Sequence, residues 1–207
     1  MCQLLGMNCA EKTDYSFSFS GFRLRGGQTD KHSHGFGISF YEGRGVRTFV
    51  DTLPAATSPV AEMVSKYPIK TLNMISHIRY ATQGRPCLAN VHPFQRELWG
   101  CYITFCHNGD MPKFSIRREN NEEYFGDENG IDQMNYPLLG KTKASDVVYT
   151  PVGDTDSEAA FCAILNALKA EFDSPPPLSM LYRKIKEICC EIVEGEEDSS
   201  IFNMLLA

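Results

Sequence analysis

Two short apolar runs around a glycine-rich turn constrain the fold of this chain most. Residues 35–41 and 46–50 alternate apolar and polar positions, and they flank the turn sequence Glu42-Gly-Arg-Gly45. This pattern predicts an antiparallel hairpin, because successive side chains of a strand point to opposite faces. Four further runs predict strands at 2–9, 72–80, 99–107 and 201–206. The chain is therefore expected to be rich in antiparallel sheet.

Helical patterns are kept apart from the strands along the chain. Helices are predicted at 14–25, 58–67, 156–172 and 178–193. The third of these places Ala160, Ile164 and Leu168 on one face, as the helical period requires. Such segregation is typical of the α+β class. Residues 111–150 have no period and are expected to form a long surface excursion within a single domain that spans 1–207.

Composition excludes several classes of function. The 207 residues carry a net charge of −6, so a nucleic-acid partner is not expected. No apolar run approaches the roughly 18–20 residues that span a bilayer, and the first residues do not form a signal peptide, so we expect no membrane partner and a cytoplasmic location. Eight cysteines without a CxxC spacing favour reduced thiols over a disulfide framework or a zinc site.

Cys2 is the first candidate for chemistry. Removal of Met1 would leave Cys2 with a free α-amine whose pKa is about 7.7–8.0. One residue would then supply both a nucleophile and its base. A cysteine at the second position, taken alone, has no catalytic role in most proteins, so the hypothesis depends on the rest of the sequence.

Six motifs supply that context. They are Met1–Gly6, Leu24–Gly26, His77–Gly84, Asn90–Pro93, Cys106–Gly109 and Gly153–Glu158. In this order the chain resembles the class II glutamine amidotransferases of the N-terminal-nucleophile hydrolase superfamily, in particular the small stand-alone members without a fused synthase domain. The resemblance covers residues 2–206 except the 111–150 excursion. It implies a four-layer αββα sandwich that uses no metal or organic cofactor.

The resemblance also implies the catalytic residues. Cys2 would attack the side-chain amide of glutamine, and the Asn108 side chain with the Gly109 backbone N–H would bind the oxyanion. The alternative for Asn108 and Gly109 is a plain turn, since Asn-Gly is a common turn sequence.

Four more residues match the family's substrate-binding positions. Arg79 would bind the α-carboxylate of glutamine with help from Thr82, and Asp156 would bind the α-ammonium group. The alternative for Asp156 is a place in the first turn of a helix that a Thr155-x-x-Glu158 capping box begins. Arg25 would steady the surroundings of the nucleophile, or else is a surface arginine.

The histidines are expected to play supporting parts. His77, His92 and His107 are predicted to be hydrogen-bonded core or site-wall residues, since the terminal amine already supplies a base. His32 and His34 are two residues apart, so on a strand they would face the same side, as two metal ligands do. No third ligand lies nearby in sequence, so we do not expect a metal site there.

The sequence departs from the family pattern in three places, one of which is Gln83, where family members with fused synthases often carry histidine. Phe36 follows His34-Gly35 where many relatives carry an acid and a tryptophan around the glycine. The resemblance also predicts more strands after Leu206, so we expect residue 207 to mark a truncation.

The predicted function is release of ammonia from glutamine through a Cys2 γ-glutamyl thioester. A separate synthase or another protein would accept the ammonia. One alternative is a hydrolase of γ-glutamyl peptides or thiol conjugates that uses the same site. The other is an inactive relative that acts as a binding module.

Overall fold

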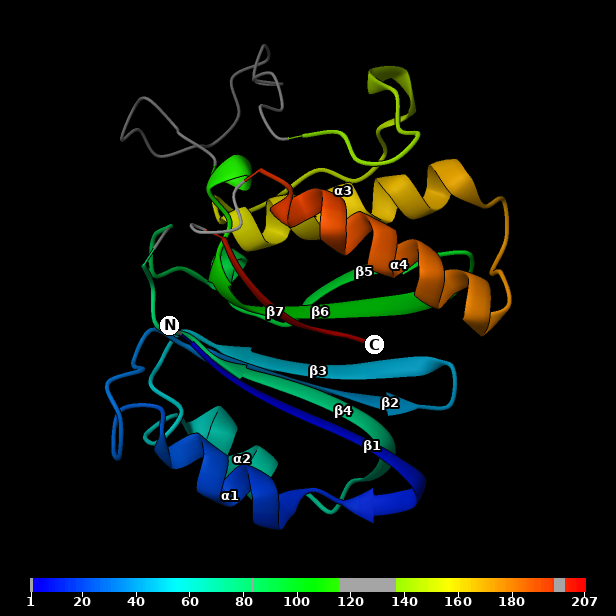
Figure 1. Ribbon diagram of the computed structural model, residues 1–207. Coiled ribbons are helices and arrows are strands. Elements are labelled where there is room, and N and C mark those ends of the chain that lie inside the picture. Colours follow the sequence, from blue (N-terminus) through cyan, green and yellow to red (C-terminus); the bar gives the residue numbers. More distant parts are fainter. Residues whose placement is uncertain (1, 83, 116–136, 196–199) are drawn as a thin grey trace, which may run out of the picture. The chain divides into compact units, whose positions relative to one another are not determined.

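The computed structural model describes residues 2–82, 84–115, 137–195 and 200–207. Contacts within the chain group it into two compact units. The first unit is Met1–Gly109 with Ile201–Ala207, and the second is Asp110–Ser200. Figure 1 shows the elements of both. Whether the two units act as the single expected domain stays a prediction.

A four-stranded antiparallel sheet forms half of the first unit. Its strands, in spatial order, are β1 (Gln3–Asp14), β4 (Lys70–Ile78), β2 (Phe36–Glu42) and β3 (Gly45–Asp51). The predicted hairpin is confirmed, because β2 pairs with β3 from Phe36 opposite Asp51 to Glu42 opposite Gly45. Gly43 in its turn has a φ of 64°, a conformation that favours glycine. β1 is longer than the predicted 2–9; its first half is partly buried and its last residues are exposed.

Two helices cover one face of this sheet (Figure 1). They are α1 (Ser16–Leu24) and α2 (Pro59–Lys66), close to their predicted bounds. α2 begins where the sequence indicates, since the Ser58 side chain accepts hydrogen bonds from the N–H groups of Val60 and Ala61. The core between helices and sheet includes Tyr15, Phe19, Phe36, Ile38, Phe40, Val64, Met74 and Ile78.

The opposite face of the four-stranded sheet carries polar links to a second sheet. This three-stranded sheet has the order β5 (Phe94–Leu98), β6 (Cys101–Asp110) and β7 (Ile201–Leu206). The Tyr41 and Thr104 hydroxyls are 2.9 Å apart, and the Thr48 hydroxyl donates to Gln95 Oε1 at 3.0 Å. Because β2 side chains alternate, Phe36, Ile38 and Phe40 enter the helix-side core, and the residues between them face the second sheet.

One strand was missing from the sequence prediction, and another began too early. The predicted strand at 99–107 begins at Cys101, because Trp99 has a φ of 57° and forms a turn with Gly100. The residues before this turn, which no predicted strand or helix covered, form β5. Their sequence Phe-Gln-Arg-Glu-Leu has a polar centre and therefore gives little sign of a strand.

The second unit contains α3 (Asp156–Glu171) and α4 (Leu178–Val193), as predicted. It also holds two short 3-10 turns, Pro112–Phe114 and Ala144–Asp146. α3 is buried on all sides from Asp156 to Leu168, whereas its pattern predicted one buried face. Much of the expected 111–150 excursion, residues 116–136, lies outside the described residues.

The described residues thus form two antiparallel sheets and four α-helices, which confirms the α+β class. None of the described helices is both long and apolar enough to cross a membrane. None of the eight cysteines, all of which lie in the described residues, forms a disulfide.

Gly37 lies where the two sheets of the first unit approach each other closely. A Cβ atom at this position would lie 2.1 Å from the His92 carbonyl oxygen. Gly37→Ala should therefore lower the free energy of unfolding by about 2–3 kcal/mol or more, measured by urea denaturation. Gly21→Ala is the matched control, because a Cβ atom there meets nothing within 4 Å and α1 would gain helix propensity. Equal stability of the two variants would contradict this packing.

Candidate functional site

Cys2 lies where the ends of the two sheets of the first unit meet. It directly precedes β1, whose Gln3 pairs with Ile78 of β4. Its backbone nitrogen donates a hydrogen bond of 2.8 Å to the Asn108 side-chain oxygen near the end of β6. Because a backbone N–H can only donate, the oxygen of the Asn108 amide faces Cys2. The structure therefore brings together two of the three predicted catalytic residues across 106 positions of sequence.

The Cys2 thiol lies against the backbone of Tyr80. The Tyr80 N–H donates to Sγ at 3.3 Å, and Sγ lies 3.5 Å from the Tyr80 carbonyl oxygen. The first contact suits a thiolate, which accepts, and the second suits a thiol, which donates. The sequence prediction assigned no role to Tyr80. The sequence signal that could have indicated a role for Tyr80 is its place directly after Arg79 in the His77–Gly84 motif.

Asn108 and Gly109 are not a turn, which was the alternative prediction. Both lie within the regular strand β6. Glycine is required at 109 because a Cβ atom there would lie 1.6 Å from the Ile201 carbonyl oxygen, at the start of β7. The Asn203 side chain donates to the Asn108 carbonyl oxygen at 3.2 Å. The Asn-Gly pair is thus fixed from the β7 side.

The predicted substrate-binding residues of the first unit lie on the segments around Cys2. Arg79 is buried, and its guanidinium donates to the carbonyl oxygens of Arg85 at 3.1 Å and Gly84 at 3.2 Å. Thr82 is exposed in the loop that separates Arg79 from these carbonyls. Arg25 follows α1 and is exposed, and it donates to the Gln3 side-chain oxygen at 2.9 Å.

Asp156 belongs to the second unit. It is buried in the first turn of α3, which the Thr155 side chain caps by accepting from the Glu158 N–H. The Asp156 carboxylate accepts from the backbone N–H of Met111 at 2.9 Å and of Ser157 at 2.8 Å. The helix-start interpretation of this motif is confirmed. The substrate-binding role stays a prediction.

A group of buried histidines lies beneath the Cys2–Asn108 contact. His77 donates through Nε2 to the His107 carbonyl oxygen at 3.1 Å, and His107 Nε2 donates to the Ile201 carbonyl oxygen at 3.0 Å. The rings of His77 and His92 are 4.2 Å apart. His77 and His107 are hydrogen-bonded core residues, as predicted. His92 is buried, but neither ring nitrogen has a hydrogen-bond partner among the described residues.

Burial sets the charge of these histidines. It lowers the pKa of His77 from 6.5 to about 3, with a smaller contribution from His107, and it lowers the pKa of His92 well below its usual value. Both rings are therefore neutral near pH 7. Within the described parts of the chain, no three His, Cys, Asp or Glu side chains are grouped to hold a metal ion.

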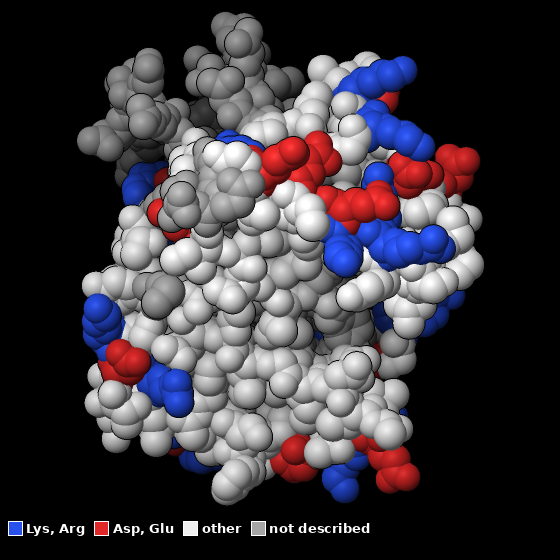
Figure 2. Space-filling view, viewed as in Figure 1, with Lys and Arg blue, Asp and Glu red and all other residues white. Residues whose placement is uncertain are grey.

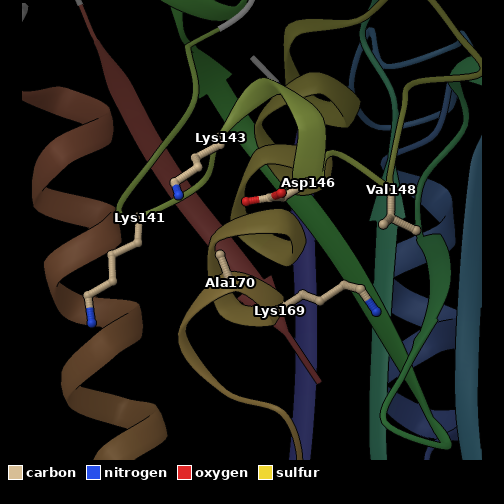
Figure 3. Close-up of a pocket in the computed structure, with 6 residues that line it drawn as sticks. All are labelled: Lys141, Lys143, Asp146, Val148, Lys169 and Ala170. Carbon is tan, nitrogen blue, oxygen red and sulfur yellow. The ribbon is translucent and has the colours of Figure 1, made fainter.

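Charge on the face shown in Figure 2 is mixed rather than of one sign, because acidic and basic residues are interspersed. A hollow of the second unit (Figure 3) is lined by Lys141, Lys143, Asp146, Val148, Lys169 and Ala170. It contains none of the predicted site residues. Glu171, which pairs with Lys141 at 3.1 Å, already balances part of its positive charge.

Comparison with known proteins identifies the family of this chain. The family model described as Glutamine amidotransferases class-II matches residues 1–131 and 134–207. The chain belongs to the class-II glutamine amidotransferases. A Haemophilus influenzae protein that carries the provisional name glutamine amidotransferase is 42% identical over 207 residues, which are 100% of this chain and 60% of that protein. YafJ of Escherichia coli K12, named in the same provisional way, is 38% identical over 208 residues, which are 100% of this chain and 69% of YafJ.

Solved structures share the fold. A predicted glutamine amidotransferase from Pseudomonas aeruginosa PA01 superposes with a TM-score of 0.61 at 34% identity, over 100% of this chain and 69% of that one. The glutamine phosphoribosylpyrophosphate amidotransferase of B. subtilis superposes with a TM-score of 0.56 at 15% identity, over 100% of this chain and 35% of that one. These likenesses confirm the predicted fold of the N-terminal-nucleophile hydrolases. The chain spans 60% of the length of its Haemophilus influenzae relative.

The buried histidines predict how stability depends on pH. The unfolded chain binds more protons than the folded one where the pKa of His77 is lowered, between pH 6.5 and about 3. The free energy of unfolding should therefore be highest above pH 6.5 and fall as the pH falls through this window, by at most about 1.4 kcal/mol per pH unit for each histidine.

Urea denaturation at pH 7.5 and pH 5 measures this dependence. His92→Phe removes one of the titrating rings while keeping a ring of similar size beside Phe94, whose centroid is 4.3 Å away. The loss of stability between the two pH values should be smaller in this variant than in the parent protein. An equal loss in both would show that His92 does not titrate on unfolding.

Proposed function

We propose that this protein is an N-terminal cysteine amidohydrolase that releases ammonia from the side chain of glutamine. The observation that supports this most is the 2.8 Å hydrogen bond between the Cys2 nitrogen and Asn108 Oδ1. Removal of Met1 would turn this nitrogen into an α-amine at the same place. The amine would then lie beside both its own thiol and the amide proposed to bind the oxyanion.

The reaction follows from these groups. The Cys2 amine takes the thiol proton, directly or through water, and Sγ attacks the γ-carboxamide carbon of glutamine. The carbonyl oxygen becomes a tetrahedral oxyanion. When it collapses, the carbon–nitrogen bond breaks and the amine returns the proton to the leaving ammonia. Water then hydrolyses the γ-glutamyl thioester, which gives glutamate and restores the thiol. This sequence uses no metal or organic cofactor.

The orientation of the Asn108 amide suits its part in this reaction. Since Oδ1 accepts from the Cys2 nitrogen, the amide NH₂ group points away from that nitrogen and can donate to an oxyanion. The Gly109 N–H is the proposed second donor. The Ile201 carbonyl, which packs against Gly109, keeps this part of β6 from moving as charge develops.

Substrate binding is assigned to the charged residues. Arg79 would bind the α-carboxylate, because its two contacts to loop carbonyls fix the plane of the guanidinium fork. Thr82 would assist from the same loop, and Arg25 would steady the segment that carries Cys2 through Gln3. Asp156 would bind the α-ammonium group. The ammonia would pass to a synthase or another acceptor protein.

Maturation and reactivity can be tested together. Intact-mass spectrometry should show loss of Met1 and then one adduct with a glutamine-mimicking electrophile at Cys2. Cys2→Ala should lower glutaminase activity by about a thousandfold or more, because no other group replaces the nucleophile. Cys101→Ala is the matched control, since Cys101 is a free and exposed thiol.

An alanine variant of Cys2 with parental activity would refute the proposal. A protein that keeps Met1 should be inactive, because its amine is blocked. Activity on γ-glutamyl dipeptides without activity on glutamine would favour the peptide hydrolase that shares this site.

Arg79 is tested by its effect on substrate affinity. Arg79→Lys keeps the charge and loses the fork, so KM for glutamine should rise about ten- to a hundredfold while kcat changes little. Arg44→Lys is the control, because Arg44 lies in the β2–β3 turn and contacts Gly100. Thermal unfolding of each variant checks that the buried site has folded. An unchanged KM would exclude Arg79 from carboxylate binding.

A further inference from the structure

We propose that His34 is a positioning residue that holds the two peptide groups facing the Cys2 thiol. The inference rests on the proposed function in one respect, namely that Cys2 is the nucleophile. His34 lies in the segment before β2, and Tyr80 lies just beyond the end of β4. Neither residue belongs to a regular strand, so other interactions must fix the backbone at Tyr80.

Three hydrogen bonds join these two segments. The Arg79 N–H donates to the Gly35 carbonyl oxygen at 2.8 Å, and the His34 N–H donates to the Arg79 carbonyl oxygen at 3.1 Å. The Ala81 N–H then donates to the His34 ring nitrogen Nδ1 at 2.8 Å. The regular pairing of β2 with β4 stops at Phe36 opposite Ile78. The His34 ring thus takes the place of the next carbonyl and extends the pairing past the end of the strand.

The two peptide groups on either side of Tyr80 connect His34 to the Cys2 sulfur. In the peptide between Arg79 and Tyr80, the carbonyl accepts from the His34 N–H and the N–H donates to Sγ at 3.3 Å. In the peptide between Tyr80 and Ala81, the N–H donates to His34 Nδ1 and the carbonyl lies 3.5 Å from Sγ. Since the N–H and C=O of a trans peptide point in opposite directions, His34 and the sulfur lie on opposite sides of both groups.

Through these peptide groups, the hydrogen bond that the His34 ring accepts affects the hydrogen bond of the Cys2 thiol. Nδ1 must be an acceptor for the Ala81 N–H, which places the ring N–H on Nε2. A hydrogen bond to one end of a peptide group polarises the other end, so the Tyr80 carbonyl becomes a better acceptor for the thiol. Without the Nδ1 contact, the Tyr80–Ala81 peptide would be free to rotate away from Sγ.

Ring packing is the competing explanation, because the His34 and Tyr80 rings have centroids 5.3 Å apart. Two substitutions separate the alternatives. His34→Asn loses the ring and keeps an acceptor oxygen at the place of Nδ1. His34→Phe keeps a ring and loses the acceptor. Gln28→Ala in the same loop is the control, since Gln28 is exposed.

The test uses mature protein and two readouts, the kinetics of glutamine hydrolysis and the rate at which iodoacetamide alkylates Cys2 at pH 7.5, followed by peptide mass spectrometry. His34→Phe should lower kcat and the alkylation rate about three- to tenfold, the effect of one hydrogen bond, with little change in KM. His34→Asn should stay within about twofold of the parent, like Gln28→Ala.

Parental values of kcat and alkylation rate in His34→Phe would overturn the proposal. So would a His34→Asn variant as slow as His34→Phe, because an acceptor at the place of Nδ1 would then not be enough to keep the site active. If His34→Phe does not fold, His34→Leu replaces it in the same comparison. If the parent itself does not hydrolyse glutamine, the proposed function fails, while the alkylation rates still decide the role of His34.

Discussion

The site depends on the hydrogen bond between the Cys2 nitrogen and the Asn108 side chain. It links the residue before β1 in one sheet to the end of β6 in the other. Its donor is the atom that becomes the proposed catalytic base once Met1 is removed. The same bond therefore orients two groups, the amine on one side and the Asn108 amide on the other. A shift of either sheet would disturb both at once.

Backbone groups make many of the other contacts that hold the site residues in place. The Tyr80 peptides face the sulfur, the loop carbonyls at 84 and 85 hold Arg79, and the Ile201 carbonyl packs on Gly109. Backbone atoms have no rotamers, so a site built from them adds no side-chain entropy cost to the cost of folding the backbone itself. Where two backbones approach this closely there is no space for a side chain, so glycine is needed at Gly37 as well as at Gly109.

The sequence predicted what local patterns determine. The β2–β3 hairpin, the start of α2 at Ser58 and the order of the family motifs are all encoded in neighbouring residues. It did not predict β5, whose central residues are polar, or the burial of α3 on every side. It also placed Asn108 in a possible turn, because the strand there depends on Ile201, which follows His107 by 94 residues. The contact of His34 with Ala81 has no local signal at all, since it joins positions 47 apart.

Long-range contacts of this kind make the chemistry a property of the folded chain. The partners of Cys2, Tyr80 and Asn108, lie 78 and 106 residues further along the chain. In a nascent or unfolded molecule neither partner lies beside the Cys2 thiol. Closing such long loops costs conformational entropy, and only the contacts of the assembled sheets offset this cost. Reactivity at Cys2 should then appear in one cooperative step with folding, so the proposed nucleophile would stay unreactive while the ribosome is still extending the polypeptide.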